Sequence, residues 1–336
     1  MGAVLEIVAH PTGPWLVKVG RAQYAVPPLL GQALRPLEGT RPSVAEMREC
    51  LGWERSAEEF ESWIGDMGLN LESGGGPRSV RVIRFRLPLL PASWVRSVAR
   101  RLRPLAGNRG LAALAVTGGA GYRAAMAGTG PIGFSPALGH VVVGLGLFLL
   151  TAIWHELGHA AALARSGYPP GGIGAGILFV IPVLYADVTA VGVLPRSGRL
   201  RVDAAGVIFQ VAPGGLMMAL AAWSGCGPFW TSALVVAGSS ALLAASWSLI
   251  PFVRSDGYWL LCDLLGLADL DRQPRKPISN RLRVFLTLYQ FANAGFLLLM
   301  GIYFPWRVIL LVLGLLHRVG VSVEPVAANG LAAGLY

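Results

Sequence analysis

Charged side chains are scarce in this chain. Of its 336 residues only 14% are Asp, Glu, Lys or Arg, whereas 54% are hydrophobic. This composition excludes an ordinary soluble globular protein and predicts a polytopic membrane protein. Cysteines are also few, and Cys50, Cys226 and Cys262 are scattered without a C-x-x-C spacing. That pattern argues against both a disulfide framework and a thiolate zinc site, so we expect reduced, structural thiols.

The start of the chain lacks the basic residues, apolar core and cleavage site of a signal peptide, so we expect the first domain to be cytosolic. The net charge of +10 is uneven: residues 1–73 hold six Lys/Arg and ten Asp/Glu, which leaves +14 for the rest. Nine arginines between residues 78 and 109 approach the first apolar segment, as is typical of cytoplasmic segments that face anionic lipids. Nucleic-acid binding is the less favoured interpretation of this basic run, and we expect no nucleic-acid partner.

Apolar segments predict about six transmembrane helices in a mainly α fold. Their expected positions are residues 111–127, 137–162, 204–223, 231–252, 284–304 and 306–316. The first segment is short and contains Arg123, but the basic loops around it require an even number of crossings. The same rule predicts a short turn near Pro305 on the outer side of the membrane.

Residues 167–195 form an apolar stretch that is rich in Gly and Pro, and these residues disfavour a regular helix. Because the segments before and after this stretch both carry the basic residues typical of the cytoplasmic side, we predict that the stretch enters and leaves the membrane on that side as a re-entrant pair of strands. Such a segment is tolerated where it lines a wet cavity, and it could offer an edge strand to an extended substrate. An additional pair of helices is the alternative.

The sequence WHELGH at residues 154–159 lies at the end of an apolar segment. On a helix, His155 and His159 share one face, and Glu156 projects beside them where it can reach a metal-bound water. The pattern H-E-x-x-H therefore predicts a Zn²⁺ site with two histidine ligands and Glu156 as the catalytic residue.

A catalytic zinc needs three protein ligands and one open position, so a third ligand must come from elsewhere. Asp256 is the preferred candidate, because a carboxylate after a long apolar span is costly unless it is paired or bound to metal. Gly257 would let the backbone come close to the site. The competing carboxylates, each more typical of a loop or a cap, are Asp187, Asp203 and Asp263. His140 is excluded, since on a continuous helix it lies about 22 Å from His155.

In this order, H-E-L-G-H, Ala205-Gly206 and Asp256-Gly257 resemble the site-2 protease family of intramembrane zinc metalloproteases. More narrowly, the segments PVLYADVT, RLRVDAAG and SDGYWLLCDLLG resemble the peptide zinc metalloproteases that are encoded with bacterial peptide natural products. The resemblance covers residues 138–270. It implies an endopeptidase of the bacterial cytoplasmic membrane that cleaves a small ribosomally made precursor peptide. Peptide-modifying enzymes or an exporter are the further partners it implies.

Two positions depart from the broad family. Its usual G-P-x-x-N element is G-V-I-F-Q at residues 206–210, and its aspartate motif usually lacks the Arg254-Ser255 found here. The resemblance would make Gln210 a substrate-amide or oxyanion contact, although a glutamine in a span is as often a hydrogen bond between helices. In the re-entrant segment we assign Tyr185 and Asp187 to substrate binding.

Residues 1–86 predict a small cytosolic α+β domain of winged-helix type. The expected elements are a hairpin at 15–19 and 23–26, a helix from Leu29, capping boxes at 43–46 and 56–59, a helix end at Gly68 and a strand at 80–85. This order resembles leader-peptide recognition domains, which pair their substrate against the hairpin edge. A structural cap is the alternative, and acidity disfavours DNA binding. A basic linker at 87–110, a metalloprotease domain at 111–318 and a tail at 319–336 without an assigned role complete the expected organisation.

We therefore expect zinc-assisted attack of water on a peptide carbonyl, with Glu156 accepting the proton and passing it to the leaving amine. The alternative function is a non-catalytic membrane partner of a peptide maturation or export system that binds the precursor. Retention of His155, Glu156 and His159 argues against that alternative. A transporter with a structural metal is disfavoured, because no other chain of ionisable residues crosses the expected spans.

Overall fold

The structure, a computed structural model, describes most of the chain. The described residues are 5–10, 15–19, 22–26, 28–40, 44–52, 54, 56, 59, 83–128, 137–178, 181–223, 225–267, 270 and 279–318. The chain divides into two units, Met1–Ala268 and Asp269–Tyr336. All residues of the candidate site belong to the first unit.

The N-terminal part begins with an antiparallel sheet of three strands, β1 Leu5–Val8, β2 Trp15–Val19 and β3 Ala22–Val26. The predicted hairpin is confirmed as β2 and β3. Three short helices follow, α1 Pro28–Leu34, the 3-10 helix η1 Arg35–Leu37 and α2 Val44–Cys50. Helix α1 packs closely on the sheet, because a Cβ added at Gly31 would lie 2.5 Å from the Trp15 ring.

One contact of the predicted N-terminal capping boxes is present. In the second capping box, the Ser56 hydroxyl accepts the N–H of Glu59 at 3.2 Å. The first residue of the other box, Ser43, the expected helix end at Gly68 and the tail at 319–336 lie outside the described residues.

Strand β4, Ile83–Leu90, corrects the prediction of a winged helix completed by residues 80–85. It pairs antiparallel with β5 Ile173–Leu178 and not with the N-terminal sheet. The sequence of β4 predicts a strand, but the strand with which it pairs depends on which sheet edge lies next to β4 in the folded protein. Here that edge belongs to the apolar segment that follows the H-E-x-x-H helix.

The basic segment expected to be a linker is folded, because β4 is followed by the amphipathic helix α4, Ala92–Leu102. Val95 and Ala99 are buried on one face of α4, where they join an apolar cluster with Leu157 and Ala160 of the H-E-x-x-H helix. The arginines of α4 lie on its other face. This segment therefore braces the helix that supplies the histidines.

The predicted pair of strands is confirmed, and the alternative of two more helices is wrong. Strands β5 and β6, Ile181–Ala186, form an antiparallel hairpin, and the sheet order is β4-β5-β6. Strand β6 is therefore an edge strand, and it contacts the H-E-x-x-H helix. Pro182 fits this position, because a proline cannot donate a ladder hydrogen bond and is tolerated on an edge.

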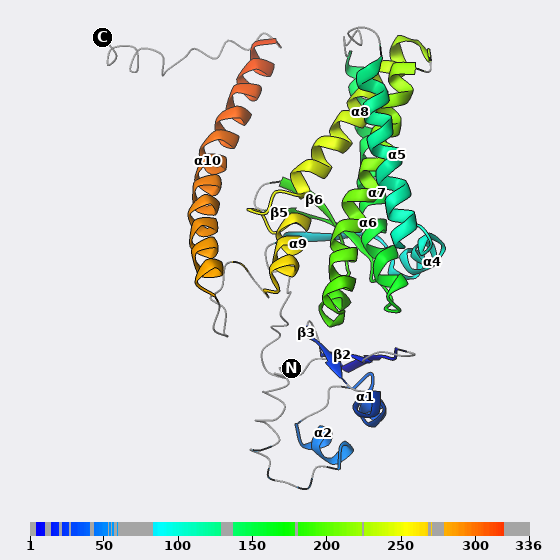
Figure 1. Ribbon diagram of the computed structural model, residues 1–336, viewed down its shortest axis with the longest axis vertical. Coiled ribbons are helices and arrows are strands. Elements are labelled where there is room, and N and C mark those ends of the chain that lie inside the picture. Colours follow the sequence, from blue (N-terminus) through cyan, green and yellow to red (C-terminus); the bar gives the residue numbers. More distant parts are fainter. Residues whose placement is uncertain are drawn as a thin grey trace, which may run out of the picture. The chain divides into compact units, whose positions relative to one another are not determined.

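Four helices of the first unit pack into a bundle, α5 Asn108–Ala127, α6 Leu138–Arg165, α7 Arg196–Trp223 and α8 Gly227–Ser248 (Figure 1). Glycines allow α5 and α7 to approach closely. A Cβ at Gly121 would lie 2.5 Å from the carbonyl oxygen of Gly215, and a Cβ at Gly215 would lie 2.0 Å from that of Gly118. The short helix α9, Asp256–Leu265, follows α8 and contacts α7.

By length and composition, four of the described helices could cross a membrane: α6, α7, α8 and residues 280–307 of α10, Asn280–Arg318. Helix α5 has 20 residues but is not among these four. The turn predicted near Pro305 is wrong, because α10 continues through this proline as a single helix. Neighbouring helices and local adjustments compensate for the lost N–H of a proline inside a membrane helix. The structure thus has the character of a helical membrane protein.

Candidate metal centre

The two histidines of the motif lie where the sequence predicts them. Both project from α6 and are buried, with the Nε2 atoms of His155 and His159 3.1 Å apart. One turn of helix separates them, so they share the face of α6 that is turned toward α7. Two imidazole nitrogens at this separation can share a proton or bind one metal ion.

The third member of the group comes from a different part of the chain. Asp256, the first residue of α9, places Oδ2 3.0 Å from Nε2 of His155 and Oδ1 3.2 Å from Nε2 of His159. The candidate ligand atoms of the three residues lie within 4.8 Å of one another, so the group could hold a metal ion. Among the described residues it is the only such group of three His, Cys, Asp or Glu side chains.

Each imidazole is oriented by a hydrogen bond on its far side. Nδ1 of His159 donates to the carbonyl oxygen of Val202 at 2.7 Å, and Nδ1 of His155 lies 2.9 Å from Oε1 of Gln210. A carbonyl oxygen can only accept, so each contact places a proton on Nδ1. When the ring is neutral, its Nε2 lone pair is then free for a metal. Both acceptors lie on α7.

Gly206 makes this arrangement possible. A Cβ at this position would lie 2.2 Å from Nε2 of His159 and 2.8 Å from Nε2 of His155, which is closer than packing allows. Gly158 has the matching role on α6, where a Cβ would lie 2.7 Å from the carbonyl oxygen of Ala205. In the sequence, Gly206 is only one residue of a short motif, and no local pattern predicts its structural role. The only signal was its place after a small residue in an apolar span.

Asp256 is held by the turn before it and by the helix after it. The Ser255 hydroxyl donates to the carbonyl oxygen of Ser248 at 2.9 Å, which joins the start of α9 to the end of α8. Gly257 approaches backbone, as predicted, but the nearest atoms belong to Leu249 and not to the metal group, with a Cβ placed 2.0 Å from its carbonyl oxygen.

An ion pair fixes the rest of α9 against α7. Nε of Arg199 donates to Oδ1 of Asp263 at 2.7 Å, and the Asp263 side chain is only 1% exposed. Asp263 therefore serves the packing of α9 and not the metal group. Asp203, another carboxylate that was a candidate for the third metal ligand, is also outside that group.

The charge of Asp256 suits a metal ligand. Burial alone would raise the pKa of its carboxyl, but the charges of the His159 and His155 rings when protonated outweigh burial and hold the pKa well below its usual range. The carboxylate is therefore ionised at neutral pH, as metal binding requires.

Glu156 is next to the group without being part of it. It is buried, with 8% of its surface exposed, and the backbone N–H of Ala186 at the end of β6 lies near its carboxylate. This contact joins the carboxylate to the edge strand of the second sheet. Glu156 is thereby placed between the histidines and the segment predicted to receive a substrate.

Tyr185 and Asp187 have local partners. Oδ1 of Asp187 accepts hydrogen bonds from the N–H and the hydroxyl of Thr189, the first residue of the 3-10 helix η2, Thr189–Val193. The Tyr185 ring covers Gly174, and the Arg86 guanidinium lies 5.6 Å from the ring centre. Neither contact reaches the metal group, and the role of both residues in substrate binding stays a prediction. Asp187 is an exposed residue of the loop between β6 and η2 and lies outside the metal group.

The N-terminal sheet meets the membrane part at the end of α6. Nε2 of His10 lies 3.0 Å from the carbonyl oxygen of Ser166, and its ring stacks on Tyr168 with centroids 4.7 Å apart. Between these two residues Gly167 has a φ of 91°, and a Cβ there would collide with the His10 ring. Strand β3 also contacts η2, which follows β6 in the chain.

Comparison with known proteins adds no relative: no family model, no curated protein and no solved structure matches this chain. Its function must therefore be argued from the geometry of the site.

Proposed function

We propose that this protein is a membrane-embedded zinc metalloendopeptidase. The observation that supports it most is the meeting of His155 and His159 with Asp256, a residue about a hundred positions further along the chain. Two imidazoles, one carboxylate and a fourth, open position form the donor set of catalytic zinc sites. A purely structural ion pair does not need an adjacent glutamate that stays outside the group.

The spacing of the donor atoms fits zinc. With bonds of about 2.0–2.1 Å in a tetrahedral arrangement, neighbouring ligand atoms lie about 3.3 Å apart. The three separations here are 3.0, 3.1 and 3.2 Å. His155, His159 and Asp256 would thus hold the ion with only small adjustments.

A zinc ion in this place would act as a Lewis acid and lower the pKa of a water toward neutrality. Glu156, adjacent to His155, would accept the proton of that water as it attacks a peptide carbonyl, and would then deliver it to the leaving amine. The N–H of Ala186, which lies near the carboxylate, would keep Glu156 in place for both proton transfers. Gln210 and Val202 keep the imidazoles in the tautomer that binds metal.

The substrate would lie along β6. The N–H of Asp187 donates to the carbonyl oxygen of Gly172, so Asp187 bonds toward β5. Backbone groups alternate in direction along a strand, so the N–H of Ala186 and the backbone groups of Leu184 point away from β5, to the free edge of β6. The Ala186 N–H on that edge already reaches Glu156. An extended peptide added there would have its backbone beside the catalytic carboxylate.

The N-terminal sheet would select that peptide. Its strands β1 and β3 are edges, and the contact of β3 with η2 connects it to the segment that continues from β6. A precursor whose leader pairs with this sheet would be retained next to the cleavage site. The substrate class we propose is a small ribosomally made precursor in the bacterial cytoplasmic membrane, with the N-terminal domain in the cytosol.

The test uses the full-length protein expressed together with a candidate small precursor peptide. Glu156→Gln should keep the zinc content of the wild type but lower processing of the peptide by roughly 10²- to 10⁴-fold, the usual contribution of a general base. Glu49→Gln, the same change at an exposed position of α2, should leave both unchanged. Mass spectrometry of the peptide reads out cleavage. Undiminished cleavage by the Glu156 variant would exclude the proposed mechanism.

The second candidate, a non-catalytic partner that only binds the precursor, is favoured by the contact between the N-terminal sheet and the membrane part. It predicts that the peptide co-purifies intact with the wild type and with the Glu156 variant alike.

A further inference from the structure

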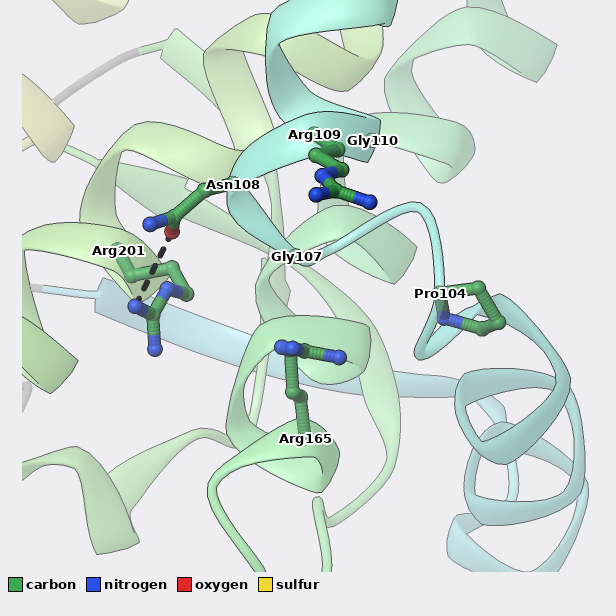
Figure 2. A pocket seen from close by; sticks show the side chains of 7 residues that line it. All are labelled: Pro104, Gly107, Asn108, Arg109, Gly110, Arg165 and Arg201. Carbon is green, nitrogen blue, oxygen red and sulfur yellow. Dashed lines mark hydrogen bonds between the residues drawn. The ribbon is translucent and has the colours of Figure 1, made fainter.

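Three arginines from three different helices line one cavity of about 360 Å³. Arg109 belongs to the first turn of α5, Arg165 is the last residue of α6, and Arg201 lies near the start of α7. Figure 2 shows their guanidinium groups around the turn at Gly107 that leads into α5. None of these residues belongs to the metal group or contacts it.

Two of the guanidinium groups are held in place. Nη2 of Arg201 donates to Oδ1 of Asn108 at 3.2 Å, the contact drawn in Figure 2. The guanidinium of Arg165 lies against the buried backbone of Gly107, where a Cβ would be 3.1 Å from Cζ and 3.3 Å from Nη2. The cavity is therefore shaped by specific contacts and is more than a patch of mobile side chains.

Within the described residues, no carboxylate balances this charge. The ion pairs of His155, His159 and Arg199 do not include Arg109, Arg165 or Arg201. No side chain caps the adjacent N-terminus of α5, so the partial positive charge of its first turn adds to that of the arginines. Cations that share a cavity repel one another, and an anion between them removes the repulsion.

We propose that this cavity, here called the arginine pocket, binds a phosphate-bearing anion, and that the anion is the headgroup of an anionic phospholipid. Guanidinium groups bind phosphate oxygens in pairs of parallel hydrogen bonds, which favours phosphate over other anions. Arg165 ends a helix that is long and apolar enough to span a membrane, so the pocket lies at the level of lipid headgroups.

Native mass spectrometry of the full-length protein in detergent tests this site, with phosphatidylglycerol, phosphatidylcholine and inorganic phosphate as probes. Wild-type protein should bind phosphatidylglycerol saturably and more tightly than phosphatidylcholine. The double change Arg165→Gln and Arg201→Gln should weaken phosphatidylglycerol binding by roughly tenfold or more, since a hydrogen bond between a guanidinium and a phosphate contributes about tenfold or more by itself. Gly107→Ala keeps every charge but puts a Cβ against the Arg165 guanidinium, and it should weaken binding as well.

The matched control is Arg96→Gln with Arg100→Gln, which removes the same charge from exposed positions of α4 outside the pocket. It should change phosphatidylglycerol binding by less than about twofold. Displacement of phosphatidylglycerol by millimolar inorganic phosphate would identify free phosphate as the ligand and overturn the lipid assignment, whereas phosphatidylglycerol binding that persists in millimolar phosphate supports it. Equal weakening by the pocket and control variants would overturn the proposal. If the double variant fails to fold, unchanged binding by Gly107→Ala would do so.

Discussion

The metal group and the arginine pocket are two concentrations of charge in the same unit of the protein, and they differ in how that charge is compensated. His155 and His159 are buried and Asp256 is partly buried, and their polar atoms have partners within the chain. Arg109 and Arg165 are exposed, and no described carboxylate pairs with them. A buried charged group needs partners within the protein, whereas an exposed charged group is solvated and can bind a ligand from solution. The comparison predicts that changes at the metal group affect stability and metal binding strongly, and that changes at the pocket affect only its ligand.

The largest expected effect is that of Gly206→Ala. The added Cβ would overlap both imidazoles, so α7 must move away from α6 and the metal group must open. We expect loss of zinc and a decrease in the free energy of unfolding of about 1–3 kcal/mol, as for overpacked cores. Zinc analysis and chemical unfolding of the purified protein measure the two effects.

Gly146→Ala is the matched control, since this glycine lies on α6 with no atom within 4 Å of an added Cβ. It should bind zinc as the wild type does. A Gly206 variant that is as stable and as zinc-loaded as the control would contradict the close packing of α6 and α7.

The next effect is that of Gln210→Ala, which removes the hydrogen-bond acceptor of His155. Loss of such an outer partner lowers metal affinity by roughly 10- to 100-fold. Gln210→Glu keeps an acceptor at the same distance and should retain tight binding, as measured by competition with a zinc chelator. If zinc affinity stays constant while the KM for the peptide rises, Gln210 contacts the substrate, as the family resemblance implies, and does not orient the histidine.

A smaller effect is expected from Arg199→Gln, which leaves the buried carboxylate of Asp263 without its cation. Because Arg199 is itself 24% exposed, we expect destabilisation of about 2 kcal/mol, below the range for fully buried pairs. Adding Asp263→Asn should recover part of this loss, and the coupling is obtained from the unfolding free energies of the double-mutant cycle. Additive losses would show that the two side chains do not interact.

The smallest effect is that of Arg165→Gln alone on stability in detergent without added lipid. An exposed arginine with no carboxylate partner should change the free energy of unfolding by less than about 0.5 kcal/mol. A loss as large as that of the Arg199 variant would remove the distinction between the two regions.

The sequence could predict the metal group, because its parts are local patterns with fixed chemistry. H-E-x-x-H places two histidines on one helical face, and the cost of a carboxylate after an apolar span singled out Asp256. Gly and Pro between residues 167 and 195 likewise predicted a strand pair where a helix was unfavourable.

What the sequence did not predict depends on contacts between distant segments. The alternation near residues 80–90 indicates a strand but not that it pairs with β5, and nothing local shows that Gly206 faces two imidazoles. The expected turn at Pro305 failed for a related reason. A proline breaks helices in water more readily than in a membrane span, where the local sequence does not show what compensates for it.

The central claim, that Asp256 completes a zinc site with the two histidines, is tested most directly by the zinc content of the purified protein and of two variants. Asp256→Ala should lose the metal, whereas Asp187→Asn, a change to an exposed carboxylate outside the group, should keep it. A single zinc per chain in the wild type and the Asp187 variant, with none in the Asp256 variant, is the predicted result. Full zinc occupancy after loss of the Asp256 carboxylate would contradict the account.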